Sequence, residues 1–236
     1  RNIAKKGFKR PTDIQFKSIP PILKREDVLG IAQTGTGKTA AFVIPVLQNL
    51  LKLSKGQRTE AVQCVVMAPT HELAEQITSV FLDFSDDLDL EILCIHGGVN
   101  QEDQIERLLK GVDVVVATPG RLFDLRSQGY LVLNDLKILV LDEADHMLDM
   151  GFIDDLQRII SHLPKEHQTL LFSATMPNSI NQLAQKILNK PEEIRLSISK
   201  PAAGVHQQVY LTFDNQKNKV LEHILSERKD FDRSIV

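Results

Sequence analysis

Two glycines and a lysine lie close together in the segment "AQTGTGKT" (residues 32–39), between a short apolar run and a helix-like stretch. Gly35 and Gly37 allow the backbone to curl so that successive amide groups point at one anion. The dipole of a following helix favours the same negative charge. The segment therefore predicts a phosphate-binding loop, in which Lys38 reaches the β- and γ-phosphates and the Thr39 hydroxyl coordinates Mg²⁺.

This loop departs from the general pattern at its first position, where Ala32 stands in place of glycine. The alternative interpretation is a glycine-rich turn around a solvated lysine. The order of strand, loop and helix favours the phosphate loop, because that motif requires this context. The loop residues expected to contact nucleotide are Gln33, Thr34, Gly35, Thr36, Gly37, Lys38 and Thr39.

A second candidate group follows the apolar run of "LKILVLDEAD" (residues 136–145), which ends in Asp142, Glu143 and Asp145. Adjacent carboxylates repel one another and are costly unless a cation neutralises them. Asp142 is predicted to join the Mg²⁺ shell, and Glu143 to orient or deprotonate an attacking water. The alternative is a solvated acidic turn. With Lys38, these two acids are the predicted catalytic residues.

Seven apolar runs of strand length must position these groups, and helix-like segments separate them. Several runs are almost continuously Val, Ile and Leu, as expected when helices cover both faces of a parallel sheet. The pattern predicts an α/β fold with a mostly parallel sheet, whose ligands bind beyond the carboxyl ends of the strands. The predicted strands lie within residues 27–32, 62–69, 91–97, 113–120, 136–145, 169–175 and 192–198. The predicted helices lie within residues 41–51, 71–85, 101–111 and 178–188.

The pattern changes near residue 200. Residues 1–200 form the predicted nucleotide-binding domain, and residues 201–208, with a proline, a glycine and two alanines, predict a linker. Residues 209–236 predict the start of a second domain, cut short at its end. Its expected elements are a strand over 206–213, a helix over 216–227 and a strand over 232–236.

Composition limits the classes of function. The chain has 236 residues, 42% of them hydrophobic, and a net charge of −3, which argues against holding nucleic acid by bulk charge. Its longest apolar runs are strand-sized, so no membrane span is expected. The two cysteines, Cys64 and Cys94, lie in apolar stretches and read as small buried side chains. They favour a reducing, cytoplasmic location.

Taken together, "AQTGTGKT", "DEAD" and "SAT" resemble the DEAD-box family of ATP-dependent RNA helicases. The segments "GFKRPTDIQ", "APTHELA", "HGG" and "TPGR" occur in the same order as further motifs of that family. The resemblance covers essentially residues 1–200. It implies a RecA-like P-loop domain followed by the start of a second RecA-like domain, ATP and Mg²⁺ as cofactors, RNA as partner, and a monomer.

The adenine site is inferred from this resemblance. "GFKRPTDIQ" resembles the family's Q motif, which implies that Phe8 lies against the adenine face and that Gln15 bonds its edge. An amide offers one donor group and one acceptor, which suits adenine. Arg10 is expected to help pack the base, and Thr12 to brace the phosphate loop. Without the resemblance, Phe8 reads as a core residue and Gln15 as a surface residue.

The resemblance also implies an RNA-binding face. Contacts from amides, hydroxyls and arginine to a sugar–phosphate backbone carry no sequence information, so binding should be sequence-independent and sensitive to salt. One position departs from the family, because His71 stands where "PTRELA" has arginine. Alone, the glycines and Pro119 read as turn residues. The implied RNA-binding residues are Pro69, Thr70, Glu72, Gly97, Gly98, Thr118, Pro119, Gly120 and Arg121.

The resemblance further implies that Ser173 and Thr175 of "SAT" couple nucleotide state to RNA state through Asp145. The expected activity is that of an RNA-dependent ATPase that unwinds short duplexes or remodels RNA–protein complexes. The family's arginine finger belongs to the second domain, so residues 1–236 alone are expected to bind nucleotide weakly and be poorly active. The alternatives are a DNA-directed helicase and an ATP-gated RNA clamp or scaffold.

Overall fold

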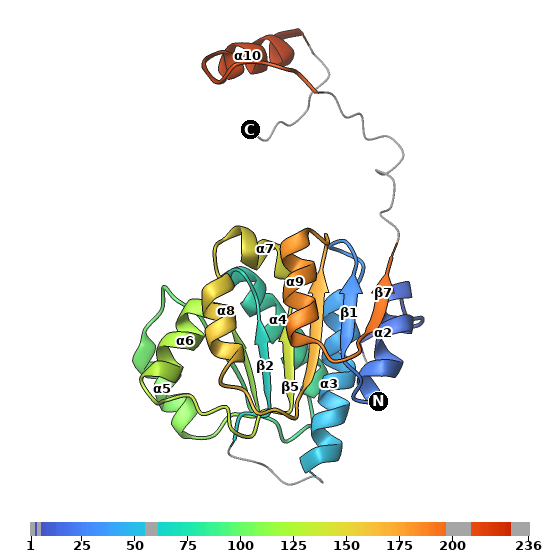
Figure 1. Cartoon of the computed structure of the whole chain (residues 1–236), viewed down its shortest axis with the longest axis vertical. Coiled ribbons are helices and arrows are strands. Elements are labelled where there is room, and N and C mark those ends of the chain that lie inside the picture. Colours follow the sequence, from blue (N-terminus) through green and yellow to red (C-terminus); the bar gives the residue numbers. More distant parts are fainter. Residues whose placement is uncertain (1–2, 4–5, 55–60, 197–208, 228–236) are drawn as a thin grey trace. The chain divides into compact units, whose positions relative to one another are not determined.

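The computed structural model describes residue 3 and residues 6–54, 61–196 and 209–227 (Figure 1). The chain divides into two compact units, residues 1–198 and 199–236, and each is described by itself.

The first unit is built on a seven-stranded sheet in which every strand pairing is parallel. The strand order across the sheet is β3-β4-β2-β5-β6-β1-β7. Each of the seven predicted strand runs overlaps one of these strands, which confirms the α/β fold and the parallel sheet. The strands are β1 (Val28–Ile31), β2 (Cys64–Met67), β3 (Ile92–Ile95), β4 (Val114–Ala117), β5 (Ile138–Leu141), β6 (Gln168–Ser173) and β7 (Glu192–Arg195).

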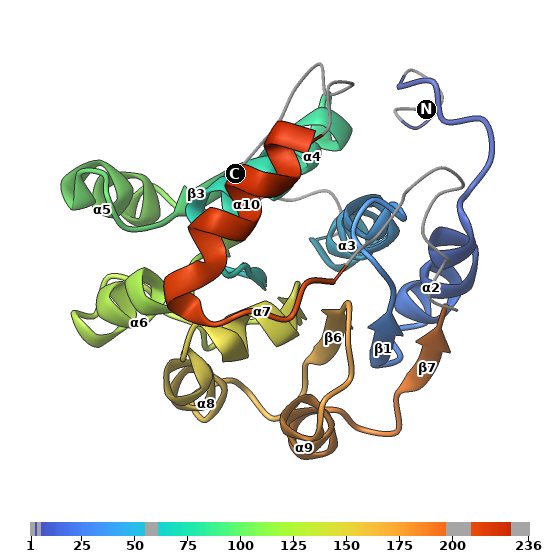
Figure 2. The ribbon, with the colours of Figure 1, turned by 90° about the horizontal axis from the view of Figure 1, so that it is seen from above.

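Helices cover both faces of the sheet, which explains its continuously apolar strands. In β2, every residue is buried, and neighbours on the strand belong to different core clusters: Val66 packs with Phe42 and Phe81 on one face. Val65 packs with Leu122 on the other. Viewed from above, α3 and α4 lie on one side of the strands and α8 and α9 on the other (Figure 2). Burial on two faces therefore selects Val, Ile and Leu at nearly every strand position.

Four predicted helices are confirmed, namely those within α3, α4, α5 and α9. Periodicity alone gave no assignment for α2, α6, α7 and α8; α2 carries two prolines in its interior, and α7 has only six residues. No helix within the described ranges is both long and apolar enough to cross a membrane. The helices of this unit are α2 (Asp13–Leu23), α3 (Lys38–Ser54), α4 (His71–Ser85), α5 (Gln101–Leu109), α6 (Pro119–Ser127), α7 (Ala144–Asp149), α8 (Ile153–Ile160) and α9 (Asn178–Ile187).

The two cysteines lie on β2 and β3, which β4 separates in the sheet, and both are free. Cys64 in β2 is fully buried, and Cys94 in β3 is partly buried. Burial raises the pKa of the Cys64 thiol, and it also raises the pKa of Cys94, with Glu75 acting in the same direction. Both are therefore held as neutral thiols that fill space.

In the second unit, the expected helix is confirmed as α10 (Lys217–Glu227), preceded by the short 3-10 helix η1 (Asp214–Gln216). The expected strand over 206–213 is wrong for its described part, because residues 209–213 form no strand. Leu211 is 98% exposed, and no strand lies beside this stretch within the described residues of the unit to complete its hydrogen bonds. The predicted linker 201–208 and the strand 232–236 lie outside the described residues.

Candidate functional site

The predicted phosphate loop joins the end of β1 to the start of α3. Gly35 and Gly37 have φ angles of +79° and +90°, a backbone region that favours glycine. A Cβ atom at Gly37 would lie 2.6 Å from Nε2 of Gln15, so the loop packs directly against α2. Within the loop, the Thr36 hydroxyl donates to the carbonyl of Gln33 over 2.8 Å. The two glycines are therefore required by the turn and by a close approach.

Lys38, the first residue of α3, is only 6% exposed. Its Nζ atom is buried and has no hydrogen-bond partner in the described part of the chain. A buried ammonium group without partners is costly, so the site suits an anion that would supply the missing acceptors. The alternative of a solvated lysine is therefore wrong.

Asp142 follows β5 at the same edge of the sheet and is 2% exposed, so it is not part of a solvated acidic turn. Burial raises the pKa of this carboxyl to about 6, whereas the charge of nearby Lys38 acts to lower it and Glu143 to raise it. The effect of Lys38 on Asp142 indicates that the two side chains face one site. A divalent cation there would also favour the ionised carboxylate.

The residues present fit Mg²⁺ better than a metal bound wholly by protein. Within the described residues there is no group of three or more His, Cys, Asp or Glu side chains able to hold a metal ion. Mg²⁺ is commonly held by one or two protein oxygens, with phosphate oxygens and water completing the shell. Thr39, the half-buried second residue of α3, and Asp142 offer that kind of donor set.

Glu143 occupies an unusual backbone conformation between β5 and α7. Its φ and ψ are 51° and 50°, in the left-handed region that non-glycine residues rarely adopt. Its N–H donates to Oδ1 of Asp142 over 3.0 Å, and its carboxylate lies 3.5 Å from Nδ1 of His146. Such strain persists only where surrounding contacts impose it, and it concentrates at functional sites.

Asp145 joins the end of β5 to the segment after β6. Its carboxylate accepts hydrogen bonds from the N–H of Ala174, from the N–H of Thr175 and, over 2.8 Å, from the Thr175 hydroxyl. The Ser173 hydroxyl accepts from the N–H of Asp145 over 3.3 Å. Partial burial acts to raise the pKa of Asp145, but bonds from Thr175, Ser173 and Ala174 together hold it below its ordinary value. The two predicted coupling segments are therefore in direct contact.

Gln15 holds the phosphate loop against α2 with both ends of its amide. Its Oε1 accepts from the N–H of Thr12 over 3.0 Å, and its Nε2 donates to the Gly37 carbonyl over 3.2 Å. The Thr12 hydroxyl lies beside Gly37, 3.2 Å from the position a Cβ would take. A glutamine amide can form two further hydrogen bonds, so a base edge remains within its capacity.

Phe8 lies beside this loop and stacks edge to face on Phe84, with ring centroids 5.5 Å apart. Phe8, Gln15, Gly37 and Thr39 contribute to the lining of a cavity of about 380 Å³. The exposed Arg10 lines a second cavity of about 210 Å³, to which Phe8 and Gln15 also contribute. The residues predicted to hold adenine are therefore close to the phosphate loop.

The residues of the predicted RNA face lie at the ends of β2, β3 and β4. Thr70 begins α4 and accepts from the N–H of Leu73 over 3.3 Å, while Pro69 before it is buried. Gly98 has a φ of +82°, and both it and Gly97 are exposed.

Two more segments complete this face. Thr118 precedes α6, whose first residue is the buried Pro119, followed by the partly exposed Gly120. Arg121 of α6 donates to Oε1 of Gln104 over 3.4 Å. Exposed Glu72 lies 3.0 Å from Nε2 of His71, and the pKa of Glu72 is lowered by a backbone hydrogen bond and, more weakly, by His71.

The strand order separates these two groups of residues. β3, β4 and β2 are consecutive in the sheet and carry the predicted RNA segments, whereas β5, β6 and β1 are consecutive and carry the predicted nucleotide segments. Parallel strands bring all six carboxyl ends to one edge. The edge therefore has two adjoining halves, which meet between β2 and β5.

Comparison with known proteins assigns the family. The family model described as DEAD/DEAH box helicase matches residues 12–183, well over half of the chain. The chain belongs to the DEAD/DEAH box helicase family. Apart from "GFKRPTDIQ", which leads into α2, the segments that resemble the motifs of this family follow strands at a single edge of the sheet.

Several members of the family are similar over nearly the whole chain. The ATP-dependent RNA helicase DeaD of Escherichia coli strain K12 is 42% identical over 232 residues, which are 98% of this chain and 36% of that protein. The DEAD-box ATP-dependent RNA helicase CshA of Geobacillus kaustophilus is 44% identical over 215 residues, 91% of this chain and 45% of that protein. The chain thus spans less than half the length of these relatives.

A solved structure supports the same fold. The crystal structure of a hypothetical ATP-dependent RNA helicase from Sulfolobus tokodaii superposes with a TM-score of 0.75 at 38% identity, covering 83% of this chain and 55% of that one. The RecA-like α/β fold expected from the sequence is therefore confirmed.

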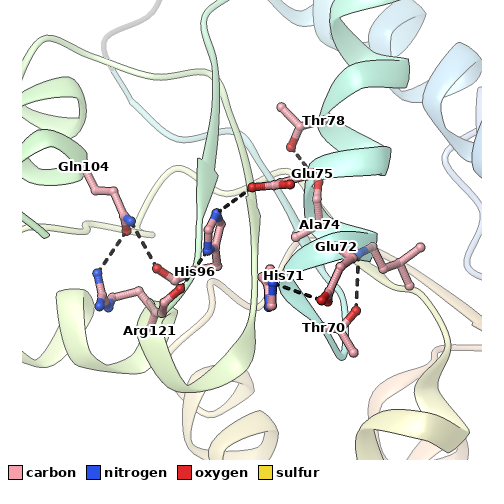
Figure 3. Close-up of polar contacts among 11 residues, drawn as sticks. Thr70, His71, Glu72, Ala74, Glu75, Thr78, His96, Gln104 and Arg121 are labelled. Carbon is pink, nitrogen blue, oxygen red and sulfur yellow. Dashed lines mark hydrogen bonds and ion pairs between the residues drawn. The ribbon is translucent and has the colours of Figure 1, made fainter. Parts of the chain in front are cut away.

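Sequence reasoning missed a polar cluster on this DEAD-box domain, drawn in Figure 3. His96 directly follows β3 and precedes the two glycines, and its ring stacks on that of His71 with centroids 5.6 Å apart. Its Nε2 lies 3.3 Å from Oε1 of Glu75. A histidine between an apolar strand and a glycine pair is the signal available in the sequence, but Glu75 is distant in the chain.

Proposed function

We propose that this chain is the first RecA-like domain of an ATP-dependent RNA helicase, with the linker at 201–208 and the second domain beginning at 209. The protein would couple ATP hydrolysis to the unwinding of short RNA duplexes or the remodelling of RNA–protein complexes. The observation that supports this most directly is the buried ammonium of Lys38 acting on the buried carboxylate of Asp142 at the loop edge. A triphosphate with Mg²⁺ complements both charges.

In this proposal the loop amides of 33–37 and Lys38 bind the β- and γ-phosphates. Thr39 and Asp142 would hold Mg²⁺, partly through water, and the ion would supply positive charge that neutralises phosphate charge. Glu143 orients the attacking water and accepts its proton. Phe8 packs on adenine with support from Arg10, and Thr12 braces the phosphate loop. Gln15 bonds the base edge while keeping its hydrogen bond to Gly37.

RNA would bind at the adjoining half of the edge, through its sugar–phosphate backbone. Gly97, Gly98 and the first turn of α6 offer amide groups, Thr70 and Thr118 offer hydroxyls, and Arg121 offers a guanidinium. Binding through such groups is independent of base sequence and weakens with salt. The bonds of Asp145 to Ser173 and Thr175 would transmit nucleotide state toward this half.

We further propose that the protein is a cytoplasmic monomer, in keeping with its two free thiols. Residues 1–236 alone would bind adenine nucleotide and turn it over poorly. Charge on the γ-phosphate must be neutralised from both sides, and the family's arginine finger belongs to the second domain.

The decisive experiment measures ATP turnover by the whole protein without nucleic acid, with single-stranded RNA, and with DNA of the same length. Stimulation by RNA, and its loss in Lys38→Ala, is the expected result. Equal stimulation by DNA would instead favour a DNA-directed helicase. If Glu143→Gln abolishes turnover but leaves the RNA-dependent function intact, the protein is an ATP-gated clamp.

A further inference from the structure

A chain of side-chain contacts crosses the proposed RNA half of the edge (Figure 3). Glu75 of α4 lies 3.3 Å from Nε2 of His96, and Nδ1 of that ring lies 2.8 Å from the carbonyl oxygen of Gly97. Nε2 of Gln104 in α5 donates to the His96 carbonyl over 3.1 Å, and Arg121 of α6 donates to Oε1 of Gln104 over 3.4 Å. We call these four side chains the His96 bridge: Glu75, His96, Gln104 and Arg121.

The two ring nitrogens of His96 both face oxygen atoms that can only accept. A carbonyl has no proton to give, so Nδ1 must donate to Gly97. Nε2 lies 3.3 Å from a carboxylate oxygen of Glu75, an ion-pair distance at which a proton on Nε2 is attracted to that oxygen. A neutral imidazole carries a single N–H. Attraction at both nitrogens therefore requires a doubly protonated ring, held between a loop and a helix.

We propose that His96 is a positioning residue for RNA binding, and that it acts by holding the glycine loop of Gly97 and Gly98 against α4 only while both ring nitrogens are protonated. This inference rests on the proposed function. When Nε2 loses its proton, its lone pair faces the carboxylate of Glu75, and the attraction becomes repulsion. The loop then loses its contact with Glu75 of α4 and becomes less ordered, so it binds the RNA backbone more weakly.

Other charged groups lie near the ring, and the experiment must distinguish their effect on RNA binding from that of His96. On α4, the exposed His71 stacks on the His96 ring, and Glu72 pairs with His71 over 3.0 Å. Two stacked cations repel, so a charge on His96 opposes a charge on His71. From α6, Arg121 is linked to His96 only through Gln104, while Arg107 of α5 donates to the carbonyl of Ile92.

The test compares RNA binding by the whole protein and its Glu75→Gln variant between about pH 5.5 and 8, the range in which histidine changes charge. A glutamine amide donates to a neutral Nε2, so the variant keeps the loop anchored at every pH. The probe is a labelled single-stranded RNA of fixed sequence, read by fluorescence anisotropy at constant salt. His71→Gln is the matched control, because it removes the neighbouring imidazole ring and leaves the His96 bridge intact.

The affinity of the unmodified protein and of His71→Gln should fall about three- to tenfold as pH rises, the cost of one lost hydrogen bond. In Glu75→Gln the RNA affinity should change by no more than about twofold over the same pH range. Nitrogen NMR of the His96 ring should show two protonated nitrogens at the acid end of the range. A pH slope that persists in Glu75→Gln, or a singly protonated ring at that end, would overturn the inference. RNA binding that is the same at every pH overturns this inference alone, whereas no binding at any pH overturns the proposed function as well.

Discussion

Replacing Gly37 by alanine should damage the protein more than the same change at Gly35, although both glycines have positive φ. Each substitution forces a Cβ into the left-handed region, at a cost of about 1–2 kcal/mol. At Gly35 nothing lies within 4 Å of the new atom, so no further cost is expected there. The pair therefore forms a matched comparison.

The additional cost at Gly37 comes from Gln15. The new Cβ would lie 2.6 Å from Nε2 of Gln15, so this buried amide must move and give up its bonds to the Gly37 carbonyl and the Thr12 N–H. Each lost hydrogen bond costs about 0.5–1.5 kcal/mol. Gly37→Ala should thus lower the free energy of unfolding by about 2–5 kcal/mol, against about 1–2 kcal/mol for Gly35→Ala.

The assay is urea unfolding followed by circular dichroism, since the chain has no tryptophan to report by fluorescence. Both glycine variants are measured in the native background and again with Gln15→Ala. In the Gln15→Ala background the difference between the two substitutions should shrink, because the obstructing amide is gone and the Thr12 hydroxyl, 3.2 Å from the new Cβ, remains as the close neighbour. Equal costs in the native background, or a difference that Gln15→Ala leaves unreduced, would contradict this explanation.

Two further predictions concern the acidic segment. Because burial raises the pKa of Asp142 from 3.8 to about 6, the native state binds more protons than the unfolded chain within that window. The stability of the native protein relative to Asp142→Asn should therefore fall as pH rises through about 6, and a difference in urea midpoint that is flat with pH would contradict this. Thr175→Val removes a donor to Asp145, whose pKa is lowered, and should cost about 0.5–1.5 kcal/mol at neutral pH. Since the contribution of a depressed carboxyl is lost on acidification, urea unfolding at low pH should show that cost shrinking, and an unchanged cost would argue against the bond.

The nucleotide half of the edge was accessible from the sequence because its signals are local. Positive φ at Gly35 and Gly37 follows from a turn between a strand and a helix that no other residue makes at low cost. The local sequence did not indicate that Lys38 and Asp142 are buried. It depends on two segments more than a hundred residues apart reaching adjacent positions at one sheet edge.

For the RNA half of the edge, the sequence indicated less and the tertiary structure decided more. The segments ending β2, β3 and β4 were identified through resemblance, but their mutual placement was not. The contacts between Glu75, His96, Gln104 and Arg121 join three helices and a loop, and no periodicity or spacing encodes such a set. The expected strand over 206–213 failed for a related reason, since strand propensity is satisfied only when a neighbouring strand is present.

The sequence by itself determined the alternation of strands and helices, the parallel class of the sheet and the turn that suits phosphate, because each follows from short-range sterics and from apolar runs buried on two faces. Only the tertiary structure decided the strand order β3-β4-β2-β5-β6-β1-β7, and with it which strand ends adjoin. It also decided which charges are buried and which histidine ring lies between two acceptors. Desolvation and hydrogen bonding act between residues that are neighbours in space, and the folded sheet creates those neighbours.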